Sequence, residues 1–353
     1  QVVDDGTSVR YLSDQYQGRV MGFEERGGVI LTDSSPIAIG VLAYGGGSAS
    51  VSRQLIEDWR YNVRQPDLSH SGGMLAAEAA AAASLSLRHA RRLATPSMIT
   101  LTASIGSPVA ADTNAASPLF GAAMAEIAQA VISLEDWGKD LVVDRVCLSI
   151  LGGAPDTLPL TAENEYASVA SALRAQIVTA TGQAQPPLIV VSPSAGAREG
   201  GAMAVSHVEA RLDQTHPALG FVVAGPRHAY DLEPDTVGTL SRQGATLMTE
   251  MEAIAVSEVQ GGGLWYCPIL ISASRSGAVI TAQFAALTDL VLDPGGDHGF
   301  ALVGVTNDAV ISSVSIAGRT ATITLSEPPT GSLTLHCASG RSGTPTGARP
   351  VNR

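Results

Sequence analysis

Residues 37–50 read IAIGVLAYGGGSAS, an apolar run that ends in a glycine-rich turn. The run from Ile37 to Tyr44 is almost free of polar side chains, which is typical of a strand buried on both faces of a sheet. Four later runs have the same character: MITLTASI (98–105), VDRVCLSIL (143–151), PLIVVS (187–192) and GFVVAG (220–225). We therefore predict that these runs form the strands of one buried sheet.

Helical patterns separate the apolar runs. Apolar residues recur at helical spacing in the intervening segments. These segments are MLAAEAAAAASLSLRHARRL (74–93), LFGAAMAEIAQAVISLEDW (119–137), EYASVASALRAQIVTAT (165–181), the shorter GAMAVSHVEARLDQ (201–214) and a last helix over about 243–257. Strands that alternate with helices predict an α/β fold with a doubly wound parallel sheet and right-handed crossovers.

The pattern changes after Gly261, Gly262 and Gly263. The runs that follow are short, rich in β-branched residues and separated by turns, and several alternate apolar with polar residues. This pattern predicts a small antiparallel β-sandwich module. The predicted organisation is an N-terminal arm (1–35), the α/β domain (36–257), the β-sandwich module (264–340) and a C-terminal tail (341–353).

Composition excludes several classes of partner. The 353 residues are 45% apolar and 15% charged, and the net charge is −12. An acidic chain without a basic run is not suited to nonspecific binding of nucleic acid or of an anionic membrane surface. No apolar run approaches the roughly 20 residues of a membrane span. We therefore expect neither a nucleic-acid partner nor a membrane span.

Metal and cofactor sites are not expected either. The three cysteines, Cys147, Cys267 and Cys337, form no CxxC motif or Cys/His cluster that would indicate zinc. We favour three free thiols, although a Cys267–Cys337 bridge inside the β module is the alternative. The loop DPGGDH (293–298) has two carboxylates, but it offers too few oxygen ligands for calcium, and Pro-Gly-Gly is typical of a turn.

A second informative segment lies near the end of the α/β domain. Gly225 to Ile254 reads GPRHAYDLEPDTVGTLSRQGATLMTEMEAI. It resembles the last block of SGNH hydrolases, where an Asp-x-x-His-Leu-Thr-x-x-Gly run supplies the catalytic acid and base. The frame of that run is held by Leu240, Ser241 and Gly244. Thr239 stands at the His position and Thr236 at the Asp position, and a hydroxyl that does not titrate near neutral pH cannot replace imidazole as a base.

The other blocks of this resemblance follow the predicted strands. The family's nucleophile turn corresponds to residues 44–50, where the serine position falls on Gly47 and a shift of one residue restores Ser48. Ser48 is then either a nucleophile or, like Ser50, a helix cap. The oxyanion glycine corresponds to Gly106, which either binds the oxyanion through its backbone N–H or belongs to an ordinary turn at the end of the strand. The third block corresponds to residues 153–156, where Asp156 either keeps an acid of the family or belongs to a turn.

A replacement triad is one further interpretation of the loop before the last helix. His228 and Asp235 lie in that loop and could act with Ser48, whereas the alternative is that His228 is an isolated loop histidine. Polar residues are also common after the fourth strand of the family, where this chain has Ser192 and Ser194.

The resemblance spans residues 36–257 and extends to SGNH-like proteins of tailed phages and gene transfer agents, some of which carry a C-terminal β module. It implies a catalytically degenerate structural or adhesion component of a phage-like particle, such as a head spike, tail or baseplate protein. Such a component is a virion protein in an oligomeric assembly with other particle proteins, and host-surface polysaccharide is a candidate ligand.

Two enzymatic alternatives remain. An active carbohydrate O-acetylesterase would use Ser48 as nucleophile, His228 as base and Asp235 to orient the imidazole, with Gly47 and Gly106 as oxyanion donors. A housekeeping hydrolase of the cytoplasm would need a working triad, and the sequence does not show one.

Overall fold

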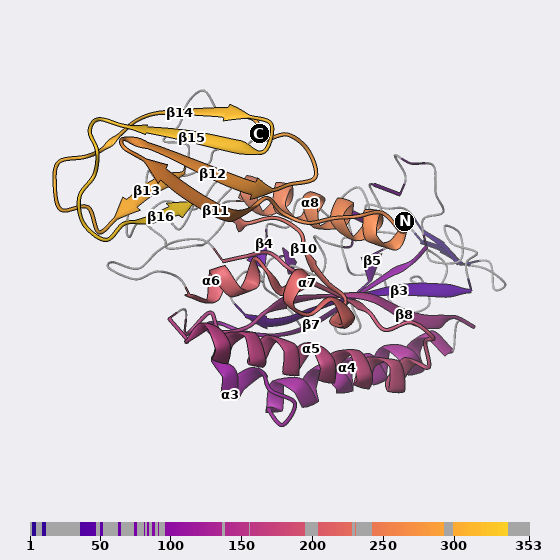
Figure 1. Cartoon of the computed structure of the whole chain (residues 1–353). Coiled ribbons are helices and arrows are strands. Elements are labelled where there is room, and N and C mark those ends of the chain that lie inside the picture. The colour runs from indigo at the N-terminus through magenta and orange to yellow at the C-terminus, as the bar shows by residue number, and fades with distance from the viewer. Residues whose placement is uncertain are drawn as a thin grey trace.

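The computed structural model describes most of the chain from residue 96 onward and shorter pieces before it. The described residues are 2–4, 9–11, 36–46, 50–51, 63–64, 74–75, 81, 83–84, 87–88, 91, 96–135, 138–154, 156–194, 204–227, 230, 242–292 and 299–337. They form a layered α/β domain that carries an antiparallel β module (Figure 1).

One parallel sheet organises the α/β domain. Its strand order is β5 (Val63–Arg64), β7 (Met98–Ile105), β3 (Ile37–Gly46), β8 (Asp140–Ser149), β9 (Leu188–Val191) and β10 (Phe221–Val223), and every pairing is parallel. After β3 the chain forms β5 at the edge of the sheet, returns to β7 beside β3, and then crosses to β8 on the other side of β3. The doubly wound parallel sheet is therefore confirmed, and the predicted strands are β3, β7, β8, β9 and β10.

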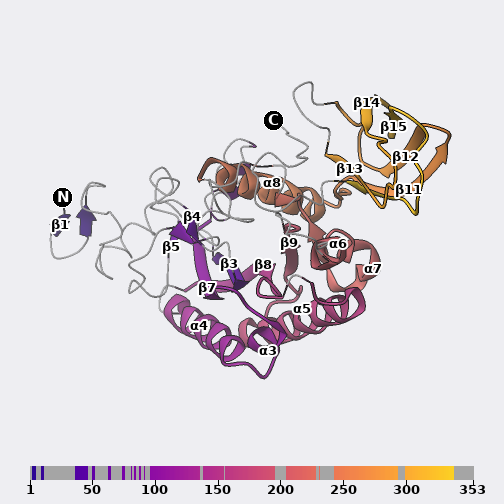
Figure 2. The ribbon, with the colours of Figure 1, turned by 90° about the vertical axis from the view of Figure 1, so that its left-hand side faces the viewer.

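Helices cover both faces of this sheet. Helices α4 (Pro118–Glu135) and α5 (Pro159–Thr181) lie on one face, and α8 (Arg242–Gln260) lies on the opposite face (Figure 2). The short helices α3 (Ala110–Thr113), α6 (Ala204–Glu209) and α7 (Leu212–Thr215) complete the layer of α4 and α5. Helix α5 begins with Pro159 at its first turn and ends at Gly182, whose φ of 72° suits a helix C-cap.

Helix α4 is unusually apolar. Within the segment Ala110–Glu135 a window of 18 residues has a mean hydropathy of 1.4, and this is the one helix of the described residues that is long and apolar enough to cross a membrane by length and composition alone. Five of its side chains are buried against the sheet: Phe120, Ala123, Ile127, Ala130 and Leu134. This packing accounts for the apolar character of the face that carries these five residues.

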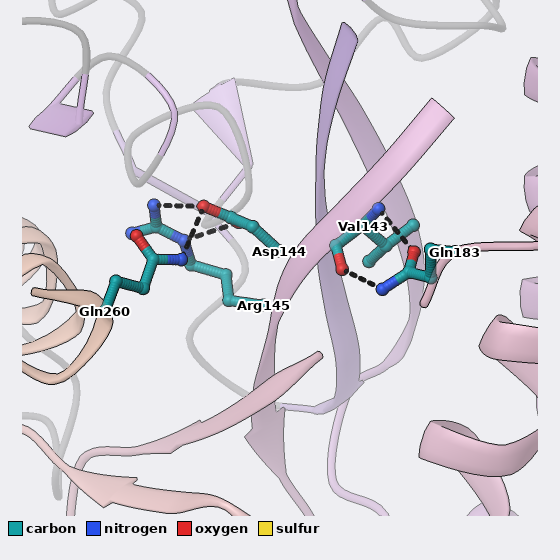
Figure 3. Close-up of polar contacts among 5 residues, drawn as sticks. All are labelled: Val143, Asp144, Arg145, Gln183 and Gln260. Atoms are coloured by element: carbon teal, nitrogen blue, oxygen red, sulfur yellow. Dashed lines mark hydrogen bonds and ion pairs between the residues drawn. The ribbon is translucent and has the colours of Figure 1, made fainter. Parts of the chain in front are cut away.

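A β-bulge interrupts strand β8. Gly40 of β3 pairs with Val143, whereas the next residue, Val41, pairs with Arg145, so that Asp144 is an extra residue. The bulge shifts the alternation of β8, because both Val143 and Val146 pack in the core against α4 and α5. The two bulge residues also bind each other: Arg145 donates to Asp144 from Nε and from Nη2 at 3.0 Å each (Figure 3).

The side chain of Gln183 completes the hydrogen bonding of β8 beside the bulge. Its Oε1 accepts from the Val143 N–H and its Nε2 donates to the Val143 carbonyl, both at 2.9 Å (Figure 3). Strand β9 pairs with β8 only from Arg145 onward. The amide of Gln183 therefore gives Val143 the backbone hydrogen bonds that β9 gives to β8 from Arg145 onward.

The β module contains two antiparallel sheets. The larger has the order β11 (Ile269–Ser276), β12 (Val279–Ala285), β15 (Thr320–Leu325) and β14 (Ile311–Ala317), and the smaller pairs β13 (Phe300–Val303) with β16 (Thr334–Cys337). Its own core includes Phe284, Phe300 and Ile323. The predicted antiparallel module is confirmed. It is joined to the α/β domain by Trp265, whose Nε1 donates to the Ala224 carbonyl at 3.1 Å.

Two details of the predicted organisation change. The helix predicted over 74–93 is wrong at its start, because Met74 and Leu75 form strand β6 and pair with β4 (Ser50–Val51). Backbone pairing with a distant segment prevails there over local helix propensity. Inside the predicted arm, β1 (Val2–Asp4) pairs with β2 (Val9–Tyr11). The three cysteines are free thiols, and the Cys267–Cys337 bridge is not formed.

Candidate functional site

A pocket opens where the carboxyl ends of the sheet strands meet helix α8. Its volume is about 430 Å³, the open mouth included. The polar lining consists of Ser104, Ser149, Ser192, Arg227 and Glu252. The rest of the lining is Ala43, Tyr44, Gly46, Cys147, Leu148, Val190 and Met248. Each of β3, β7, β8 and β9 contributes residues from its carboxyl half, which is the edge where doubly wound sheets bind ligands.

Glu252 is the acidic group of the pocket. It projects from α8, is only 6% exposed, and its Oε1 accepts a hydrogen bond from the Ser192 hydroxyl at 2.6 Å. Burial raises the pKa of the Glu252 carboxyl above its ordinary value, against the opposing effects of the Ser192 hydrogen bond and of the Arg227 and Arg145 charges. The pocket therefore contains a carboxyl group that holds its proton more strongly than a solvated one.

Arg227 is the one cationic side chain among the described residues that line this pocket. Its backbone N–H donates to the Pro193 carbonyl at 3.0 Å, which fixes the loop after β10 to the end of β9. Its Nη2 donates to the Ser149 hydroxyl at 3.4 Å, and its buried Nε has no hydrogen-bond partner in the described part of the chain. The guanidinium therefore keeps an unused donor next to the pocket.

A second buried carboxylate supports the pocket from outside its lining. Glu209 of α6 is 1% exposed, contacts the Tyr166 hydroxyl and accepts from the Ser194 N–H at 2.6 Å. Burial raises the pKa of both Glu209 and Tyr166. Because Ser194 follows Ser192 by two residues, this network fixes the backbone that carries Ser192. We assign Glu209 a positioning role.

The structure places only part of the predicted site. The predictions for Gly47, Ser48, His228, Asp235, Thr236 and Thr239 lie outside the described residues. Gly46, the last residue of β3, lines the pocket, and Gly47 and Ser48 follow it in the sequence.

Gly106 and Asp156 are exposed and are absent from the pocket lining. The turns that carry them nevertheless touch, because the Gly153 N–H donates to the Pro108 carbonyl at 2.8 Å. A Cβ at Gly153 would overlap the Ser107 carbonyl, so this approach requires glycine. The second and third blocks of the resemblance are thus neighbours in space.

Three polar residues of the pocket are not predicted as site residues from the sequence: Ser149, Arg227 and Glu252. For Glu252 a signal exists, because it lies four residues after the buried Met248, on the same side of α8. A charged residue within the apolar stripe of a helix indicates a buried polar role. The sequence gives no comparable signal for Arg227 and Ser149. No cluster of metal-binding side chains is found among the residues that the structure describes.

No family model matches the sequence, and no curated protein matches it. Among solved structures, a carbohydrate acetylesterase from Xanthomonas citri is similar, with a TM-score of 0.55 and 15% identity over 89% of this chain and 78% of that one. A protein from Arabidopsis thaliana has a TM-score of 0.44 and 12% identity over 63% of this chain and 98% of its own. A carbohydrate acetylesterase from Sinorhizobium meliloti has a TM-score of 0.34 and 14% identity over 63% and 98%.

The first of these likenesses concerns the fold. It covers 89% of this chain, in which a parallel sheet is flanked by helices on both faces. The chain therefore has an SGNH-hydrolase-like α/β fold, followed by an antiparallel β module.

Proposed function

We propose that this chain is a carbohydrate-binding component of a phage-like particle, built on an SGNH hydrolase scaffold that no longer cleaves esters. One observation carries the proposal, namely a pocket lined by polar groups in a chain whose sequence lacks the base of the family's catalytic block. Ser192, Arg227 and Glu252 line the pocket, whereas Thr236 and Thr239 stand at the family's Asp and His positions. Binding without cleavage is the expected property of such a site.

A carbohydrate suits the pocket by its chemistry. Hydroxyl groups of a sugar both donate and accept hydrogen bonds, and the lining offers a carboxyl, a guanidinium and serine hydroxyls. The ligand that we propose is a polysaccharide of the host surface.

The particle is proposed on the resemblance to phage and gene-transfer-agent proteins and on the β module that follows the α/β domain. Other particle proteins are then the partners, and the chain is present in several copies. A tagged chain is expected to co-sediment with purified particles. A free pool without any particle-bound fraction would contradict this part of the proposal.

The loss of ester cleavage is tested with p-nitrophenyl acetate. We expect the purified protein and its Ser48→Ala variant to hydrolyse this ester at the same rate, close to that of the buffer. Turnover by the unmodified protein that disappears in Ser48→Ala would contradict the proposal.

A carbohydrate O-acetylesterase is the second candidate, favoured by the fold likeness to the Xanthomonas citri enzyme. In that function Ser48 attacks the acetyl carbonyl, His228 takes the serine proton, and Asp235 orients the imidazole. Backbone N–H groups of Gly47 and Gly106 would bind the oxyanion. This candidate requires that Ser48→Ala and His228→Ala each abolish hydrolysis, while Ser50→Ala retains it.

A further inference from the structure

We propose that strand β14 pairs with β14 of a second copy of this chain in the antiparallel direction, so that two β modules share one continuous sheet. This contact goes beyond the proposed function and does not depend on what the pocket binds. Three features of β14 support it: its position at the edge of its sheet, its uncharged sequence, and the opposite charges at its two ends.

Strand β14 ends the four-stranded sheet of the β module. Within the described residues 242–292 and 299–337 it pairs with β15 alone. Alternate residues of an edge strand direct both the N–H and the C=O away from the single neighbouring strand, so β14 presents a row of backbone donors and acceptors that another strand can bond. Figure 1 shows β14 on the side of the β module that lies away from the parallel sheet.

The two edge strands of this sheet differ in their protection against pairing with another chain. Charged residues, prolines and contacts from other elements protect an edge strand. The other edge, β11, carries the exposed Arg275, and the Arg211 guanidinium of the α/β domain donates to its Leu270 carbonyl at 3.3 Å. Strand β14 reads ISSVSIA and has neither a charged residue nor a proline. The unprotected edge is therefore that of β14.

The sequence of β14 favours its own copy as the partner. A bulge lies between Ile311 and Ser313, and residues 313–317 pair regularly with β15. Antiparallel pairing about Val314 sets Ser313 of one copy opposite the partner's Ser315, and the core faces of the two modules stay on the same side of the joint sheet. Small uncharged side chains then meet along the contact, although the chain as a whole has a net charge of −12.

The charges at the two ends of β14 fit the same arrangement. Asp308 lies before β14 and Arg319 lies after it, and both are exposed. An antiparallel copy brings the start of one strand beside the end of the other, so Asp308 lies near the partner's Arg319 at each end of the pair. Opposite charges across neighbouring strands are stabilising, whereas a parallel arrangement would bring like charges together.

The test exchanges charges on the two exposed serines of β14 and follows sedimentation of the full chain over a concentration series. We expect the unmodified protein to form dimers as the concentration rises. A lysine variant (Ser313→Lys with Ser315→Lys) and a glutamate variant (Ser313→Glu with Ser315→Glu) should each self-associate at least about 10-fold more weakly, because like charges then lie opposite each other at two places. An equimolar mixture of the two variants should regain the dimer, because lysines then lie opposite glutamates.

The matched control places the same lysines on the other edge strand, as Ser272→Lys with Ser274→Lys, which changes exposed serines of β11. This control should dimerise like the unmodified protein. A protein that stays monomeric over the whole series overturns the proposed pairing, and so does a dimer that the lysine variant leaves equally strong. A mixture of folded lysine and glutamate variants that does not regain the dimer overturns pairing about Val314.

Circular dichroism shows whether each variant is folded. If a double variant is not, Asp308→Lys replaces it in the test, because this change sets a lysine near the partner's Arg319 and should weaken the dimer; an unchanged dimer would then overturn the pairing. None of these measurements depends on the pocket, so failure of the β14 contact is distinguishable from failure of the proposed function.

Discussion

Glu252 lines the pocket, but the burial of its carboxyl also makes the folded protein less stable as the pH rises. Burial raises the pKa of its carboxyl in the folded protein, so the folded state holds the proton more tightly than the unfolded state. Its stabilising contribution is fully present below the unfolded pKa of about 4.3 and is lost as the pH rises through the folded pKa. At higher pH, folding leaves a buried charge.

We therefore expect Glu252→Gln to stabilise the protein at pH 8 by about 1 kcal/mol and to give no gain near pH 4. The amide introduced by this substitution would still accept the Ser192 hydrogen bond without carrying a charge. Urea unfolding at both pH values measures the difference, with Glu250→Gln as control. An equal effect of Glu252→Gln at both pH values would show that the carboxyl is solvated like that of Glu250.

The backbone of Val143 in strand β8 depends on one side chain for its hydrogen bonds. Val143 is fully buried, and the Gln183 amide bonds both its N–H and its carbonyl. Gln183→Ala leaves these groups without that partner, and a buried unsatisfied group costs about 1–3 kcal/mol. We expect this loss in the free energy of unfolding. Gln185→Ala is the control, since exposed Gln185 contacts Gln183 through its backbone carbonyl. Equal stability of the two variants would mean that water replaces the two hydrogen bonds from Gln183 to Val143.

The elements of the sheet could be predicted because their signal is local. Runs of apolar residues such as 98–105 coincide with β7 from Met98 to Ile105, and helical spacing located α4, α5 and α8. The bulge at Asp144 could not be predicted, because it is defined by the register of β8 against β3. Strand β6 was missed for the same reason, since only its pairing with β4 makes it a strand.

The site was less predictable than the fold, because a pocket joins residues from several elements. Ser104 and Ser192 lie at the ends of the predicted strands 98–105 and 187–192, and both line the pocket. Glu252 and Arg227 joined them only through the packing of α8 and of the loop after β10 on the sheet edge. Asp156, an acid suggested by the resemblance, is exposed instead.

The three thiols lie in different parts of the molecule. Cys147 belongs to the parallel sheet, Cys267 to the segment that joins the α/β domain to the β module, and Cys337 to the β module. Burial raises the pKa of Cys267 to about 12 and that of Cys337 to about 11, and it also raises the pKa of Cys147. A thiol reacts as the thiolate, so all three should be unreactive in the folded protein.

At pH 8 we expect the thiols of the folded chain to react with a disulfide reagent at least about 100-fold more slowly than those of the chain in urea. In urea the chain should react with three equivalents of the reagent, one for each cysteine. Mass spectrometry after partial unfolding identifies which thiol reacts first. Rapid reaction of Cys337 alone would indicate that the β module opens independently of the α/β domain. Rapid reaction of all three in the folded protein would contradict the burial described above.

The bulge at Asp144 also has a genetic consequence. Asp144 is the extra residue, and β3 pairs without interruption on both sides of it, Gly40 with Val143 and Val41 with Arg145. Loss of its codon would make Val143 and Arg145 consecutive and leave these pairs in register, so Leu148 would still face α4 and α5. An in-frame deletion within a buried strand, usually a severe lesion, would at this one codon of β8 remove the bulge and leave the faces of the later residues unchanged.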